Sequence, residues 1–235
     1  MSDWLNVTLL TALAGFAMPV GACLAAFENI QSRWLQQEFR HLVIAFGGGA
    51  LLSAVALVLV PEGSEHLSIP AAAVCFASGG LSFMALDIWL ARVNSPMGQM
   101  AAMLSDFVPE SIALGAAIAA GSQAGLLLAG LMALQNVPEG FNAFRELRTA
   151  FRPATIITAF SAMALLGPVS GLTGFYLLAP YPVSVAGIMM FAAGGILYIV
   201  FGDIAPEAKL KNAWMVPFGA VAGFLLGLIG KMLTG

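Results

Sequence analysis

The sequence predicts an all-α integral membrane protein with eight transmembrane helices, forming a single domain over residues 1–235. Hydrophobic residues make up 60% of the chain and charged residues only 9%, whereas soluble domains carry about 25% charged residues. The mean hydropathy of +0.93 agrees with this composition. Basic residues gather in the short segments between apolar stretches, as they do in polytopic membrane proteins.

Eight apolar stretches are each long enough for a helix that crosses the hydrocarbon core, which takes about 20 residues. They cover residues 4–27, 42–60, 69–91, 99–120, 124–144, 154–178, 182–203 and 213–233. No basic segment precedes the first stretch, so we expect a retained helix and not a cleaved signal peptide. Cys23 and Cys75 both lie in apolar stretches, where a small hydrophobic role is expected and no disulfide is inferred.

The basic residues predict the orientation of the helices. Eight of the nine follow odd-numbered stretches, namely Arg33, Arg40, Arg92, Arg145, Arg148, Arg152, Lys209 and Lys211, and only Lys231 does not. The positive-inside rule therefore predicts cytoplasmic odd-numbered loops and both termini outside, in a cell (inner) membrane. The expected surroundings are the lipid bilayer, and the net charge of −3 gives no indication of nucleic acid.

An internal repeat relates the second and seventh stretches. They align without a gap at an offset of 145 positions, with these identities: Phe46 and Phe191, Gly49 and Gly194, Leu52 and Leu197, Pro61 and Pro206, Glu62 and Glu207. The two stretches run in opposite directions through the membrane. We therefore predict an inverted repeat of helices 1–3 and 6–8 around helices 4 and 5. Secondary transporters are often built in this way, with the binding site near the midplane on interrupted helices.

The fourth and fifth stretches each contain one polar interruption of the same form. The first runs from Asp106 to Glu110 and the second, 29 positions later, from Gln135 to Glu139. Residues i and i+4 share a helix face, and Pro109 and Pro138 each free a backbone carbonyl and favour a kink. If the two faces meet, three carboxylates and an amide oxygen converge near mid-membrane. An unpaired carboxylate is costly there, so a cation or proton site is predicted.

Other ionisable residues lie near the predicted helix ends, where solvation or ion pairing is an equally simple explanation. Glu62, Glu65 and His66 lie at the outer end of the second stretch, Asp87 near Arg92 at the inner end of the third, and Asp203 and Glu207 at the inner end of the seventh. They are candidates for points where a cation enters or leaves.

The paired Pro-Glu motifs, the glycine-rich second stretch ending in residues 59–62, and residues 197–207 resemble the ZIP (Zrt/Irt-like) divalent metal transporters, in the form of a divergent prokaryotic-type member. The resemblance covers essentially the whole chain and implies eight spans with both termini outside. It also implies transport of divalent metal, zinc-like or broader, toward the cytoplasm by alternating access. Spans 1, 4, 5 and 6 would move against spans 2, 3, 7 and 8. The metal would be a substrate, with no organic cofactor and no enzymatic activity.

By position, the resemblance implies a metal site of Asp106, Glu110, Gln135 and Glu139, in which Asp106 and Gln135 stand where histidines are usual. Asn136 could serve a second metal, but Phe107 cannot, and residues 154–178 hold no acid. We therefore expect one metal. An all-oxygen ligand set suits harder cations such as Mn²⁺ better than zinc, so selectivity should be broad, with Fe and Cd included.

Two other functions stay open. One is a relative that has lost metal transport and acts as a scaffold or moves another solute. The other is an intramembrane aspartyl enzyme that uses Asp203 with Asp87 or Asp106, although the fuller Gly-x-Gly-Asp pattern fails at Val200. Small residues at Gly219, Gly223 and Gly227 predict a close helix contact, within the chain or in a homodimer.

Overall fold

The computed structural model describes residues 2–27, 38–93, 98–121, 124–209 and 213–234, and the regular structure in these ranges is helical. Arg33 and Lys211 lie outside the described residues. In chain order, with η for a π-helical stretch, the elements are α1 (Asp3–Phe27), α2 (Arg40–Ala54), η2 (Val55–Leu59), α3 (Val60–Glu65), α4 (Ile69–Val93), α5 (Gly98–Ala119), α6 (Ala124–Leu147), α7 (Pro153–Ala164), α8 (Leu166–Thr173), η3 (Gly174–Leu178), α9 (Pro182–Ile199), η4 (Val200–Ile204), α10 (Ala205–Glu207) and α11 (Met215–Thr234). The all-α class is confirmed.

Seven of the described helices are long and apolar enough to cross a membrane. They are α1, the α2–α3 run, α4, α5, the α7–η3 run, the α9–α10 run and α11. The remaining predicted stretch, residues 124–144, coincides with α6, which is less apolar because it carries Gln135, Asn136 and Glu139. Since α6 packs against α1, α2, α5 and α11, its polar side chains face protein and not lipid.

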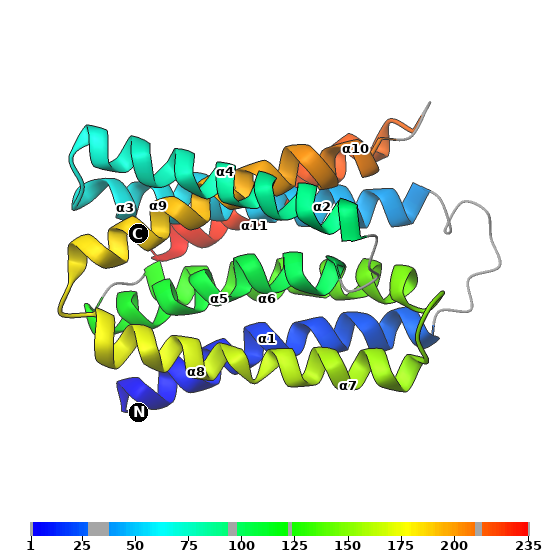
Figure 1. Cartoon of the computed structure of the whole chain (residues 1–235), viewed down its shortest axis with the longest axis horizontal. Coiled ribbons are helices and arrows are strands. Elements are labelled where there is room, and N and C mark those ends of the chain that lie inside the picture. The colour runs from blue at the N-terminus through cyan, green and yellow to red at the C-terminus, as the bar shows by residue number, and fades with distance from the viewer. Residues whose placement is uncertain (1, 28–37, 94–97, 122–123, 210–212, 235) are drawn as a thin grey trace.

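The helices form two groups that lie one above the other in Figure 1. In one group α1, α5, α6, α7 and α8 pack together, and in the other α2, α3, α4, α9 and α11 do. The groups meet where α2 packs against α6 and α5 packs against α9. The first group contains the predicted spans 1, 4, 5 and 6, and the second contains spans 2, 3, 7 and 8. By the family resemblance, these are the two sets that would move against each other.

The small-residue face of α11 contacts α2 of the same chain. A Cβ added at Gly219 or Gly223 would crowd the carbonyl oxygens of Leu42 and Phe46, and one at Gly227 would crowd the hydroxyl of Ser53. Without side chains at these positions the two backbones can approach closely. The glycine face therefore serves packing within the chain.

Within the described residues, three helical runs include a π-helical stretch of five residues, and two of these stretches have the offset of the sequence repeat. Val55–Leu59 and Val200–Ile204 begin 145 positions apart, since 200 − 55 = 145. An extra residue in a helical turn rotates the following side chains, and such turns often occur at functional sites. By contrast, α5 and α6 continue as single α-helices through Pro109 and Pro138.

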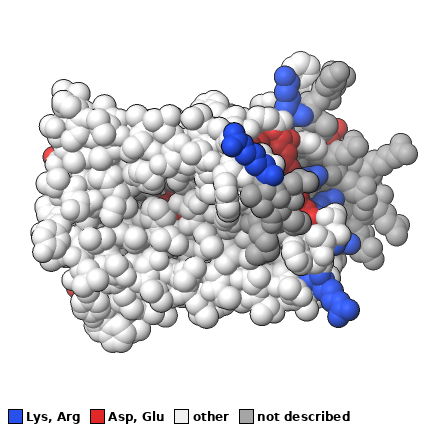
Figure 2. Space-filling view, in the orientation of Figure 1, with Lys and Arg blue, Asp and Glu red and all other residues white. Residues whose placement is uncertain are grey.

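Basic residues mark one end of the bundle. The start of α2, the end of α4, the α6–α7 connection and the end of α10 lie together there, and both termini lie toward the opposite end (Figure 1). We name the first the basic end, for its residues Arg40, Arg92, Arg145, Arg148, Arg152 and Lys209. Figure 2 shows Lys and Arg side chains gathered at this end on the face in view, next to a broad uncharged surface. This pattern fits a multi-pass membrane protein.

Candidate functional site

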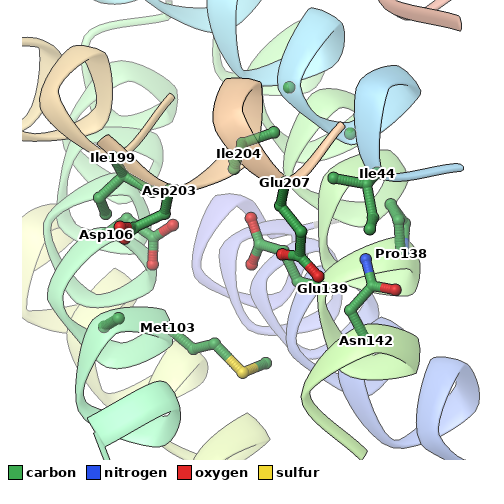
Figure 3. A pocket seen from close by; sticks show the side chains of 13 residues that line it. Ile44, Met103, Asp106, Pro138, Glu139, Asn142, Ile199, Asp203, Ile204 and Glu207 are labelled. Atoms are coloured by element: carbon green, nitrogen blue, oxygen red, sulfur yellow. The ribbon is translucent and has the colours of Figure 1, made fainter. Parts of the chain in front are cut away.

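A cavity of about 100 Å³ lies between the two helix groups. Its walls come from α2, α5, α6 and the α9–α10 run, and its polar lining consists of Asp106, Glu139, Asn142, Asp203 and Glu207. Figure 3 shows these side chains around one space, with the acids of α5 and α6 facing those of the α9–α10 run. Glycines at positions 47 and 48 of α2 form part of the wall, where a larger side chain would meet Pro138 or Ile204.

Two of the three predicted carboxylates line this cavity. Asp106 is only 4% exposed, and its Oδ1 accepts a 2.8 Å hydrogen bond from the backbone N–H of Phe107. Glu139 is half-buried and lies on the facing wall, from α6. The ring of Phe107 points elsewhere: a Cβ added at Gly15 or Gly167 would lie within 3.0 Å of it, so it packs between α1 and α8.

Glu110 lies one helical turn beyond Asp106 and forms a pair with Gln135. The Gln135 side-chain nitrogen donates a 2.9 Å hydrogen bond to Oε2 of Glu110. Both side chains are 0% exposed and neither lines the cavity. The structure therefore brings Asp106 and Glu139 onto one cavity and holds Glu110 and Gln135 behind it.

Asn136 contacts a different helix. Its side-chain nitrogen donates a 2.8 Å hydrogen bond to the carbonyl oxygen of Ala14 in α1. It is 1% exposed and does not line the cavity. In this arrangement Asn136 ties α6 to α1, and it lies apart from the cavity-lining acids.

Several buried oxygens around the α5–α6 contact have no hydrogen-bond partner among the described residues. They are Oε1 of Glu110, Oγ of Ser111, Oε1 of Gln135, Oε2 of Glu139 and Oδ1 of Asn142. Buried acceptors are nearly always paired, and an unpaired one in a native fold calls for a water or an ion. An acceptor-only group such as a carboxylate can be satisfied by a cation or by protonation.

An ion pair stands at the basic end of the cavity. Nη2 of Arg40 and Oε1 of Glu207 are 2.6 Å apart, which links the start of α2 to the end of α10. Glu146, near the end of α6, is electrostatically coupled to this pair. Desolvation raises the pKa of Glu146 and the nearby Glu207 raises it further, while Arg40 acts in the opposite direction. In the sequence, Glu207 lies close to Lys209 and Lys211. In the structure it pairs with Arg40, 167 positions away.

The remaining candidates fall at two other places. Asp87 is exposed and accepts a 2.9 Å hydrogen bond from the hydroxyl of Tyr198. Glu62 and His66 line a smaller cavity of about 70 Å³ between α3, α5 and α9, near the end opposite the basic end. Glu65 is exposed and lines none of these cavities.

The carboxylates do not close around a single point. Within the described part of the chain, no group of three or more His, Cys, Asp or Glu side chains is placed to hold a metal ion. Asp106 and Glu110 share a face of α5, but Asp106 lines the cavity while Glu110 accepts a hydrogen bond from Gln135 behind it.

Sequence reasoning missed two cavity residues that helical spacing could have found. Asn142 lies three positions after Glu139, and Met103 lies three positions before Asp106, so each shares a helix face with its neighbour. Asn142 adds an amide and Met103 a thioether to the lining. The Arg40–Glu207 pair has no comparable local signal, because only the folded chain brings these two residues together.

A comparison of the sequence with protein-family models gave no match. A search of curated proteins also gave none.

Proposed function

We propose that this chain is a carrier that moves divalent metal cations across a membrane, with the cation bound between α5 and α6. The observation that carries the proposal is the set of unpartnered buried oxygens on Glu110, Gln135 and Glu139. Buried carboxylates without a partner are costly in a low-dielectric interior, and a bound cation would relieve that cost. α5 contains no Lys or Arg that could do the same.

The ligand types suggest which cations are carried. Asp106, Glu110, Glu139 and Gln135 offer only oxygen as a ligand atom, and Met103 in the cavity wall offers a softer thioether. Oxygen ligands suit Mn²⁺ and similar cations, whereas zinc usually recruits nitrogen or sulfur. We propose a broad selectivity in which zinc is accepted but not preferred.

The cavity supplies a route between the site and the basic end. Asp203 and Glu207 line it together with Asp106 and Glu139, and α10, which carries Glu207, lies at the basic end. A cation that leaves the α5–α6 site would pass these carboxylates and then the Arg40–Glu207 pair. Glu62 and His66 would meet it on the opposite side, where the second cavity lies. We propose that the basic end faces the cytoplasm, so that both termini lie outside.

Eight transmembrane helices arranged as an inverted repeat are part of this proposal, with α6 as the buried eighth span. Packing around two glycines supports the repeat. A Cβ at Gly49 would overlap the carbonyl oxygen of Ala220 in α11. At an offset of 145 positions, a Cβ at Gly194 would overlap the carbonyl oxygen of Phe76 in α4. The contact between α2 and α11 therefore has a counterpart between α9 and α4.

The glycines of α11 and α4 make contacts with α2 and α9 that are matched in the same way. A Cβ at Gly223 of α11 would overlap the carbonyl oxygen of Phe46, and one at Gly79 of α4 would overlap that of Phe191. Phe46 and Phe191 are again 145 positions apart, and Gly79 and Gly223 are 144 apart. These four contacts form two matched pairs. Chance recurrence of Gly and Phe in an apolar chain does not readily explain them. An inverted repeat gives two related conformations of one bundle, which is the basis of alternating access.

A second candidate, an aspartyl enzyme, is favoured by one observation. Asp106 and Asp203 line the same cavity, as the two acids of such a site would have to do. This reading leaves the unpartnered oxygens of Glu110, Gln135 and Glu139 unexplained. A relative that has lost transport is the third candidate.

Metal uptake into proteoliposomes separates the three candidates. The protein is reconstituted around a metal-sensitive dye, and initial rates are measured for Mn²⁺ and Zn²⁺. Glu139→Gln is expected to slow uptake by at least about tenfold, since loss of even a partner of a metal ligand costs that much. Glu65→Gln, an exposed carboxylate outside the cavities, is the matched control.

Each alternative has its own signature in this uptake assay or in a peptide-cleavage assay on the same proteoliposomes. No uptake by the wild-type protein with any metal would favour the non-transporting relative. Cleavage of membrane-embedded peptides that is lost in both Asp106→Asn and Asp203→Asn would favour the enzyme. Equal uptake by wild-type protein and Glu139→Gln would contradict the proposed site.

A further inference from the structure

A second and larger cavity, of about 390 Å³, lies on the outer side of the second helix group. It is a wedge between α2, the η4–α10 run and α11, with Ala45, Leu52, Phe201 and Ala220 among its apolar walls. Lys209 is the charged residue in its lining, within the described part of the chain. The described lining therefore combines apolar walls with one cation.

The surface around the cavity faces outward from the bundle. Phe201 in its wall is 65% exposed, and Phe218, one residue after the lining Pro217, is 58% exposed. In a chain that spans a bilayer, large apolar side chains with this exposure contact lipid. The cavity consequently opens toward lipid and not toward water.

Two residues indicate the level in the membrane at which the cavity opens. Lys209 follows α10 at the basic end, and Trp214, two residues before the lining Val216, is 89% exposed. Tryptophan concentrates at the level of the lipid headgroups, and lysine at the ends of spans reaches the same level. From Ala45 to Leu52 the α2 wall runs about 11 Å deeper, at 1.5 Å per residue.

We infer that this cavity binds an anionic phospholipid, with one acyl chain between α2 and α11 and the headgroup phosphate on Lys209. Apolar cavities exclude water, so an aqueous filling is disfavoured. An acyl chain supplies the apolar contacts that the walls lack. The lysine ammonium is a compact charge that attracts phosphate, and it stands at the leaflet where anionic lipids are expected.

The lipid would lie directly behind the wall of the polar cavity. Gly48 and Ile204 line both cavities. A Cβ added at Gly48 would lie 2.7 Å from Cγ2 of Ile204, so these two residues lie close together in the wall that the cavities share. A bound lipid would support the η4 stretch from the membrane side. The inference depends on the chain lying in a bilayer with its basic end at the cytoplasmic leaflet, as proposed above, and not on metal transport.

Native mass spectrometry of the purified full chain tests the proposal directly. The protein is incubated with phosphatidylglycerol or phosphatidylcholine of the same acyl chains, and bound lipids are counted. We expect one phosphatidylglycerol per chain, retained in preference to phosphatidylcholine. Lys209→Gln should reduce this preference by about fivefold, the contribution of one basic residue near an anionic surface. Ala205→Trp, which fills the cavity from an exposed position, should reduce retention of both lipids.

Matched variants at the basic end but outside the cavity control for general effects. They are Arg92→Gln and Ala91→Trp on α4, both at exposed positions. Equal lipid retention by all variants would overturn the proposal. So would competition by inorganic phosphate at the level of the lipid, which would indicate a phosphate site. A dimer that Ala205→Trp dissociates without a change in bound lipid would assign the cavity to a second copy and likewise overturn it.

Discussion

The side-chain nitrogen of Gln135 donates a 2.9 Å hydrogen bond to Oε2 of Glu110, and this bond joins α6 to α5 inside the bundle. Oε1 of Glu110 and Oε1 of Gln135 are both buried and have no hydrogen-bond partner among the described residues. The pair is therefore half-satisfied, and such a pair is expected to bind a further cation or proton. Its neighbour Asn136 is bonded to Ala14 instead and provides a natural comparison.

Gln135→His is expected to raise affinity for zinc relative to Mn²⁺. A neutral imidazole can donate one N–H to Glu110 and offer its other nitrogen to zinc, which prefers nitrogen ligands. Affinities are measured by competition with fluorescent chelators. Asn136→His is the control and should leave the preference unchanged, because that side chain contacts α1. An unchanged preference in Gln135→His would remove Gln135 from the proposed site.

Metal binding is expected to strengthen as the pH rises from about 5 to 8. A cation must displace protons from the buried carboxyl groups, and fewer protons need displacing at higher pH. Calorimetry in buffers of different ionisation enthalpy counts the protons released. Glu110→Gln or Glu139→Gln should lower affinity and proton release together, while Glu65→Gln changes neither. A flat pH profile would count against ligation by these carboxyl groups.

One metal ion per chain is expected at the α5–α6 contact. Phe107, next to Asp106, has no atom that can bind a metal, and its ring packs between α1 and α8. Anomalous scattering from crystals soaked in Mn²⁺ or Zn²⁺ would locate and count the ions. Two well-occupied ions about 4 Å apart, the separation of two-metal centres, would refute this expectation.

Thiol labelling is expected to assign the basic end to the cytoplasm. In a variant that lacks Cys23 and Cys75, a cysteine is placed at Thr149 or at Ser64, which are exposed at opposite ends of the bundle. In right-side-out vesicles an impermeant reagent should label Ser64→Cys and spare Thr149→Cys. The opposite pattern would invert the topology.

Gly223→Ala should destabilise the bundle by about 1–3 kcal/mol, the usual cost of overpacking. The added Cβ would overlap the carbonyl oxygen of Phe46 and push α11 away from α2. Gly79→Ala, its counterpart in the proposed repeat, should have a similar effect at α4. Gly130→Ala is the control, because nothing lies within 4 Å of that Cβ and alanine favours a helix. Thermal unfolding in detergent measures all three, and a Gly223→Ala protein as stable as the wild type would contradict the close contact.

The sequence by itself determined the helical class and the positions of the helices. A bilayer requires each segment to satisfy its own backbone hydrogen bonds, so apolar runs of sufficient length are enough to locate helices. The predicted stretches 4–27 and 69–91, for example, correspond to α1 (Asp3–Phe27) and α4 (Ile69–Val93). The sequence also indicated Asp106 and Glu139 as site residues. It further showed that residues 46–62 align with residues 191–207.

Only the tertiary structure decided which polar groups share a space. Helical periodicity gives the face on which a side chain lies, but not the rotation and depth of that face against a neighbouring helix. For this reason Asp106 and Glu139 meet Asp203 and Glu207 in one cavity, while Glu110 is bonded to Gln135 and Asn136 to α1. The same holds for the Arg40–Glu207 pair and for the apolar cavity beside Lys209, because both depend on helix contacts that no local pattern encodes.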